Sequence, residues 1–175
     1  MRGKGLVYVV LAVLVTAVPA YAGFGMRSGE IGMDLGQTSF DSSVTNESGT
    51  DYALRGGYNF SKLLEVEGQY ADSSANDVSG DVSLNTYMVN AVFNFHPTQA
   101  IVPYCLGGIG QASMKVGTLD DNASAYQLAL GSRFMFGGTK RAGLRVELSS
   151  LSEKTFNDTQ RHSSLNVGFT WRLGS

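Results

Sequence analysis

Apolar and polar residues alternate with a period of two along most of the chain. Near residue 30, Ile31, Met33 and Leu35 alternate with acidic residues and glycines. Successive side chains of a β-strand point to opposite faces, so this pattern gathers the apolar groups on one face. Similar alternation recurs around residues 52–60, 64–70, 87–95, 101–113, 126–136, 144–148 and 165–173. The pattern therefore predicts eight strands.

The connections between these strands alternate between long and short. Short connections follow the even-numbered strands, at residues 60–63, 96–99 and 137–141. The others are rich in Ser, Asn, Asp and Thr, as solvated loops are, and span about residues 41–50, 72–81, 114–122 and 150–160. Up-and-down barrels of the outer membrane combine short periplasmic turns with long external loops. We therefore predict an all-β fold, an eight-stranded antiparallel up-and-down transmembrane β-barrel with both mature termini in the periplasm.

Alternation alone does not say which face of the barrel points outward, because a soluble lipocalin-like barrel has the same pattern. Volume favours the membrane barrel, since most of the aromatic residues would overpack the narrow interior of an eight-stranded barrel. Outside, aromatic residues near strand ends would form the girdles of a lipid-facing surface. The predicted girdle residues are Tyr58, Phe60, Tyr70, Phe93, Phe95, Tyr126, Phe136 and Trp171.

The stretch 101–113 has the least regular alternation, because glycines occupy several of its positions. The apolar side chains Val102, Tyr104 and Leu106 share one face of this strand. We expect that face to be the outward one, as on the other strands.

The N-terminal segment has the three parts of a secretory signal peptide. A basic start precedes an apolar core at residues 6–18 and a small-x-small site that ends at Ala22. This pattern predicts a signal peptide at residues 1–22 and a barrel domain at residues 23–175. A short uncleaved anchor is the alternative, but the apolar core is too short to span a bilayer comfortably.

Composition excludes several classes of protein. Beyond the N-terminal segment, no apolar run approaches the roughly 20 residues that a spanning helix needs, which excludes a helical membrane protein. The formal net charge of −2 argues against nucleic acid as a partner. Cys105 is the single cysteine, so no intrachain disulfide can form, and we interpret it as a small strand hydrophobe.

Two stretches resemble the small eight-stranded outer-membrane barrels, a family that includes the OmpA transmembrane domain and OmpX. Residues 103–110 look like the Pro-Tyr-x-x-x-Gly-x-Gly strand common in such barrels, and residues 165–173 are similar to their closing strand. The resemblance covers essentially residues 23–175. It implies residence in a bacterial outer membrane, contact with its lipid and lipopolysaccharide, and recognition of the C-terminal strand by the barrel-assembly machinery.

The inward polar face of such a barrel would bring charged residues from several strands into one lumen. The predicted set is Glu30, Asp34, Arg55, Glu65, Glu67, Arg133, Arg145, Glu147 and Arg172. An isolated charge in a narrow, low-dielectric interior is costly, so these five acids and four bases should pair into a lattice that plugs the lumen. A gated pore lined by the same charges is the alternative, although eight strands leave little open lumen.

No motif in the sequence supports an enzyme. The chain has no phosphate-binding loop, dinucleotide fingerprint or zinc spacing, so we expect no catalytic residue, cofactor or metal. His162 and Ser164 share a strand face, and some barrel lipid A deacylases use a His and Ser pair. The strand pattern points this pair inward, away from lipid, and no orienting acid can be assigned.

The expected role is therefore non-enzymatic: structural, adhesive or envelope-stabilising, through external loops that meet an unknown extracellular partner. A small-solute channel is the main alternative, and a lipid A-modifying enzyme or a soluble periplasmic barrel is a weaker one. The predicted loops are acidic and could hold divalent cations or simply be solvated. Loop recognition has no portable motif, so the sequence leaves the partner open.

Overall fold

The computed structural model describes residues 28–40, 48–77, 80–95, 100–116, 119–136, 141–155 and 158–173. The predicted signal peptide and its cleavage site at Ala22 lie outside the described residues. Within the described part of the chain, no helix is long and apolar enough to cross a membrane.

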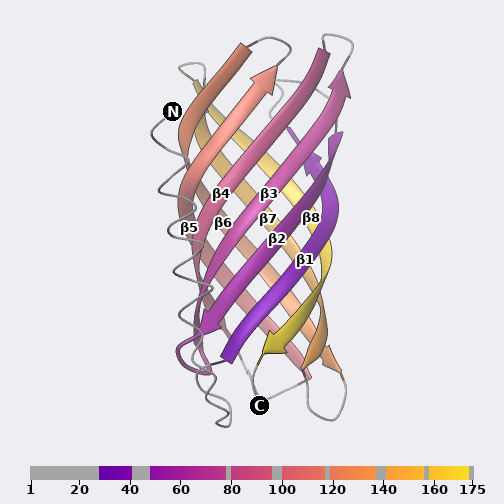
Figure 1. Cartoon of the computed structure of the whole chain (residues 1–175), viewed down its shortest axis with the longest axis vertical. Coiled ribbons are helices and arrows are strands. Elements are labelled where there is room, and N and C mark those ends of the chain that lie inside the picture. Colours follow the sequence, from indigo (N-terminus) through magenta and orange to yellow (C-terminus); the bar gives the residue numbers. More distant parts are fainter. Residues whose placement is uncertain are drawn as a thin grey trace.

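Eight antiparallel strands form a closed barrel in which each strand pairs with the next (Figure 1). They are β1 (Ser28–Ser39), β2 (Ser48–Asn59), β3 (Leu64–Asp77), β4 (Gly80–Asn94), β5 (Ile101–Val116), β6 (Leu119–Phe136), β7 (Ala142–Thr155) and β8 (Asp158–Leu173). The first strand also pairs with the last, from Gly29 opposite Leu173 to Ser39 opposite Ser163, and this pairing closes the barrel. The predicted all-β, eight-stranded antiparallel fold is confirmed.

Three hairpins extend the barrel at one end, which we call the extended end. The β3–β4, β5–β6 and β7–β8 hairpins each have only two residues between their strand ends. The prediction of long loops near residues 72–81, 114–122 and 150–160 is therefore wrong. Backbone pairing between adjacent strands continues through these polar stretches, because Ser, Asn and Asp are tolerated on strand faces that meet water. Of the loop predicted at residues 41–50, residues 41–47 lie outside the described part.

Large apolar side chains cover the outside of the barrel on every strand. The predicted outward side chains of β6 are among the most exposed, with Leu128 71% and Leu130 66% exposed. Their neighbours Gln127 and Ala129 are buried inside. This inside-out arrangement confirms the orientation that barrel volume predicted, and it suits a solvent of hydrocarbon rather than water.

Outward aromatic residues are grouped at the two borders of this apolar band. Tyrosines lie at the border nearest the extended end, and they are Tyr52, Tyr70, Tyr87 and Tyr126. Most aromatic residues at the opposite border are phenylalanines, and that group is Tyr58, Phe60, Phe93, Phe95, Phe134, Phe136, Phe169 and Trp171. All eight predicted girdle residues therefore face outward at a border of the band.

The prediction for β5 is wrong. Val102, Tyr104 and Leu106 point into the barrel and are at most 4% exposed, whereas Ile101 and Ile109 face outward. A tyrosine has an apolar ring and a polar hydroxyl, so a polar interior can accept it where the hydroxyl finds a partner. Inside this barrel, the Tyr104 hydroxyl has two such partners, Glu147 and Arg145.

Glycines make room for the largest interior side chains. Gly131 lies opposite Tyr104 in the β5–β6 register, and a Cβ atom at Gly131 would collide with the Tyr104 ring and lie 2.7 Å from the Val146 carbonyl oxygen. Gly108 lies opposite Asn90 in the same way, and its Cβ would collide with the Asn90 amide. The close approach of these side chains to the opposite backbone therefore requires glycine.

Two arginine substitutions on the outer face of β6 should locate the border of the apolar band. Leu128→Arg should cost about 2–4 kcal/mol, because it places a charge near the bilayer midplane. Ser124→Arg, four residues away on the same face but beyond Tyr126, should cost little. The readout is the folded fraction in lipid vesicles, followed by the faster migration of folded barrel in unheated gels. Equal folding of the two variants would contradict the lipid-facing band.

Candidate functional site

Two arginines and two glutamates form the centre of the barrel interior. The Arg55 guanidinium lies 2.9 Å from a Glu67 carboxylate oxygen and 2.8 Å from one of Glu147, and it also pairs with Asp34. Arg145 approaches the same two glutamates, at 2.6 Å each. All five side chains are buried. Because each glutamate is shared by both arginines, the four groups form one closed ring of ion pairs across the lumen.

Arg133 organises a second group, nearer the end of the barrel where the described chain starts and finishes. Its Nε lies 3.0 Å from Glu30 Oε1, and its Nη1 lies 3.0 Å from Glu65 Oε2 and donates to Asn94 Oδ1 at 2.8 Å. Glu30 is held from its other side by Arg172 at 3.1 Å. A longer contact of 3.9 Å between Arg133 and Glu67 connects this group to the central ring.

Tyr104 lies between the two groups. Its hydroxyl donates to Glu147 Oε2 at 2.7 Å and accepts from Arg145 Nε at 2.6 Å. The guanidinium carbons of Arg133 and Arg145 lie 4.8 Å and 4.7 Å from the centre of its ring, within cation–π range. The sequence pattern did not reveal Tyr104 as part of this network. The feature of the sequence that could have indicated an inward Tyr104 is Gly131, but that Gly131 lies opposite Tyr104 becomes apparent only from the strand register.

The structure brings all nine predicted lattice residues together in this network. Eight of them are at most 5% exposed: Glu30, Asp34, Arg55, Glu65, Glu67, Arg133, Arg145 and Glu147. The side chain of Arg172 is 22% exposed, because it lies at the end of β8. Neutral side chains extend the network, since Gln69 accepts hydrogen bonds from Arg55 at 3.1 Å and from Asn90 at 2.9 Å.

An apolar cluster occupies part of the interior at the extended end. Buried side chains from four strands, β3 to β6, and the residue after β1 pack together there: Phe40, Ala75, Val82, Leu84, Met88, Ala112, Met114 and Ala125. Between this apolar cluster and the charged network, hydroxyl groups pair with one another, as Thr38 and Ser164 do at 2.7 Å. The lumen is therefore filled by charged, hydroxyl and apolar side chains in succession along its axis.

The His162 side chain points into the interior at the extended end. It is 1% exposed, its Nε2 lies 3.1 Å from Glu153 Oε1, and its ring contacts Phe40 edge-on at 5.4 Å between centroids. The predicted inward direction of His162 is confirmed. Glu153 is an acidic partner that the sequence did not reveal. The Ser164 hydroxyl pairs with Thr38, and neither His162 nor Ser164 reaches the lipid-facing surface.

Across the described ranges, no group of three or more His, Cys, Asp or Glu side chains has an arrangement that could hold a metal ion. The charged network is also unlike a hydrolytic site, since its carboxylates are engaged by arginines in the interior. What the arrangement does physically is fill and cross-link the barrel, because its ion pairs join β1, β2, β3, β6 and β7.

Comparison with known proteins gives the family. The model of the outer membrane protein beta-barrel domain matches residues 8–172. No curated protein sequence matches the chain significantly.

Several solved barrels have a similar fold. Neisserial surface protein A, from Neisseria, has a TM-score of 0.62 at 16% identity, over 83% of this chain and 96% of that one. The N-terminal β-barrel domain of Pseudomonas aeruginosa OprF has a TM-score of 0.59 at 16% identity, over 84% and 99%. OprG from Pseudomonas aeruginosa has a TM-score of 0.57 at 12% identity, over 86% and 99%. At these identities the likeness shows the fold alone, and it confirms the resemblance to small eight-stranded outer-membrane barrels. With its closed eight-stranded barrel and a family match over nearly its whole length, the chain belongs to the outer membrane protein beta-barrel domain family.

Proposed function

We propose that this protein is a non-enzymatic outer-membrane barrel with a structural, adhesive or envelope-stabilising role, performed by its outer surface and its extended end rather than by its lumen. The observation that carries the proposal is the filled interior. Ion pairs join β2, β3 and β7 across the barrel, and an apolar cluster packs between them and the extended end. A permeating solute would have to break both layers.

The shape of the barrel supports one orientation. We place the extended hairpins outside the cell and both mature termini in the periplasm, because outer-membrane barrels have short periplasmic turns and longer external segments. In this orientation the tyrosine border faces the outer leaflet, where lipopolysaccharide resides. The closing strand β8 would be the segment that the barrel-assembly machinery reads, and the hairpin tips would meet any extracellular partner.

A catalytic role has little structural support. A lipid A-modifying enzyme needs its catalytic groups on the surface that meets lipid. His162 and Glu153 are instead buried in the lumen, 1% and 2% exposed, beneath apolar side chains such as Phe40. We therefore propose no reaction for this pair. Its hydrogen bond gives the His162 ring and one oxygen of Glu153 a partner, which reduces the cost of burying them.

Planar-bilayer recording should separate the structural role from a channel. We expect no stepwise current from wild-type barrel, because the charged network and the apolar cluster close the lumen in series. Insertion must be verified by the faster gel migration of the same unheated sample. Reproducible conductance steps that scale with the amount of inserted barrel would contradict the sealed lumen and favour the channel.

A further inference from the structure

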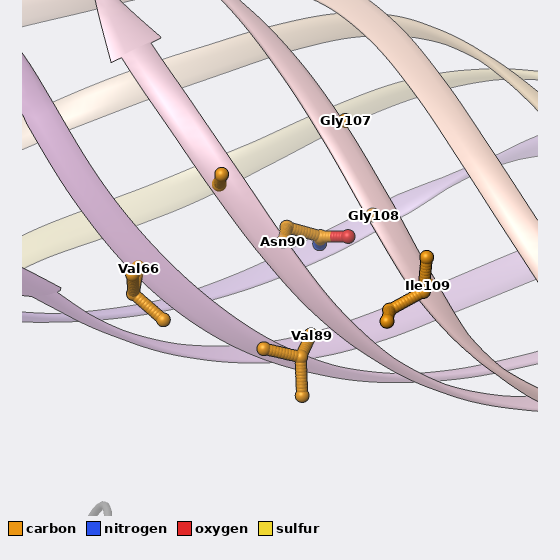
Figure 2. A pocket seen from close by; sticks show the side chains of 7 residues that line it. Val66, Val89, Asn90, Gly107, Gly108 and Ile109 are labelled. Carbon is orange, nitrogen blue, oxygen red and sulfur yellow. The ribbon is translucent and has the colours of Figure 1, made fainter.

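The outer face of β3, β4 and β5 is hollowed at the middle of the apolar band (Figure 2). The depression has a volume of about 270 Å³, and Val66, Val89 and Ile109 stand around it. Ala91 and Gly107 create the hollow, since they lie opposite each other in the β4–β5 register and neither carries a side chain beyond Cβ. On the neighbouring strand β6, Leu128 and Leu130 occupy the same band.

A tyrosine ledge borders the hollow on the side of the extended end. One step along the same face from Val89, Tyr87 lies opposite Tyr70 of β3, and their ring centroids are 5.0 Å apart. Tyr52 of β2 continues the ledge, with its ring centroid 6.4 Å from that of Tyr70. Gln111 of β5 lies opposite Tyr87 on the other side and is exposed.

Hydrogen-bonding side chains occupy the next positions of the same outer face, beyond the tyrosine ledge toward the extended end. Asp72 lies opposite Asn85, and Asn85 lies opposite Ser113. Tyr70 Oη donates to Asn85 Oδ1 at 2.9 Å, and Asn85 Nδ2 donates to Ser83 Oγ at 3.3 Å. These hydrogen bonds fix the direction of the Asn85 amide on the outer surface.

The next position toward the extended end carries a basic residue. Lys115 of β5 lies opposite Ser83 and is exposed. From the middle of the bilayer toward the extended end, the outer face of β2–β5 therefore carries first an apolar hollow, then aromatic rings, then a carboxylate with an amide, and finally an ammonium group. On β7, β8 and β1, the border of the apolar band nearest the extended end is formed instead by leucines: Leu148, Leu165 and Leu35. The order of chemistry on the β2–β5 face is thus confined to one side of the barrel.

We propose that this face is a binding site for the lipid anchor of lipopolysaccharide, an outer-leaflet glycolipid with a phosphorylated sugar headgroup. An acyl chain fills the hollow beside Ala91 and Gly107. The apolar faces of a sugar ring stack on the tyrosine ledge, and sugar hydroxyls donate to Asp72 and Asn85. A headgroup phosphate lies toward Lys115, which supplies the positive charge.

The carboxylate is what selects the occupant. Asp72 repels the phosphate of a simple anionic phospholipid, whose headgroup cannot turn a row of hydroxyl donors toward it. A phosphorylated sugar carries both kinds of group, separated by a ring, and so matches Asp72 and Lys115 together. The inference rests on the proposed function, because it requires the extended end to face the outer leaflet.

Native mass spectrometry of folded protein in detergent tests the site, with hexa-acylated lipid A and phosphatidylglycerol as competing probes. Wild-type barrel should retain lipid A at least tenfold more strongly than phosphatidylglycerol. The double variant Ala91→Leu/Gly107→Leu should lower lipid A retention at least tenfold, because it fills the hollow while keeping the face apolar. Gly56→Leu is the matched control, since Gly56 faces outward on β2, outside the hollow, with open space around its Cβ position.

A second double variant, Asp72→Ala/Asn85→Ala, tests the headgroup contacts independently of the hollow. It should remove the preference for lipid A, because lipid A loses its hydroxyl acceptors and phosphatidylglycerol, no longer repelled by Asp72, is retained more strongly. Equal retention of the two lipids by wild-type barrel, or unchanged lipid A retention in both double variants, would overturn the site. If wild-type protein gave no fast-migrating folded band in lipid vesicles, the proposed function itself would fail. A folded barrel that retains no lipid A contradicts this inference alone.

Discussion

Arg145→Ala is expected to destabilise the folded barrel by about 3–5 kcal/mol, the range for removing one partner of a buried ion pair. The arginine contacts Glu67 and Glu147 and donates to the Tyr104 hydroxyl, so its loss leaves two buried carboxylates short of a partner. Unfolding in urea, read from gel migration of unheated samples in detergent, gives the free energy change.

The matched control for Arg145→Ala is Arg161→Ala, which removes the same side chain from an exposed position on β8. An exposed arginine contributes at most about 1 kcal/mol through its surface contacts. Adding Glu147→Ala to Arg145→Ala should cost less than the sum of the two single changes, because they share one interaction. Equal urea midpoints for Arg145→Ala and Arg161→Ala would contradict a lumen held by its charged network.

Gly131→Ala should be almost as damaging, with a cost of about 3 kcal/mol, through overpacking and the displacement of a hydrogen-bonded side chain. The added methyl group would collide with the Tyr104 ring, which cannot retreat because Arg145 and Glu147 hold its hydroxyl. Gly56→Ala is the control, since a Cβ there meets no atom within 4 Å. The same urea titration compares the two variants.

The cost of Gly131→Ala should fall when the colliding ring is removed. In a Tyr104→Ala background, the added methyl group no longer meets the ring and only the 2.7 Å approach to the Val146 carbonyl oxygen remains, so the second substitution should cost at least 1 kcal/mol less than in the wild-type barrel. The same cost in both backgrounds would mean that Gly131 matters for its backbone and not for the room it leaves. That result would contradict the pairing of inward glycines with large interior side chains.

Much of this fold could be predicted because the membrane imposes two different environments on each strand. Leu128 and Gln127 are neighbours in the chain, yet one meets lipid and the other the lumen, so a period of two is visible in the sequence. The same parity placed Arg55, Glu67 and Arg145 inside. Which arginine meets which glutamate could not be predicted, because it depends on the register around the closed barrel and on side-chain reach.

The two wrong predictions from the sequence, the outward face of β5 and the long loops, have different physical causes. Tyr104 was assigned to the lipid face because its ring is apolar, whereas its hydroxyl decides its position through contacts with Glu147 and Arg145. The polar stretches near residues 72–81 and 114–122 were assigned to loops because of their side chains. Strand pairing beyond the membrane is set by the backbone and by long-range register, so polar composition does not end a strand there.

Contact between lipid and the apolar outer face of this barrel can be tested with the native protein through its single tryptophan. Trp171 lies on the outer face of β8, near the border of the apolar band, and is 44% exposed. In vesicles containing brominated phospholipids, we expect strong quenching of its fluorescence, greater with bromine near the headgroup than near the end of the acyl chain. Iodide in the surrounding water should quench it only weakly. Strong iodide quenching together with no effect of brominated lipid would contradict a membrane barrel and favour a soluble one.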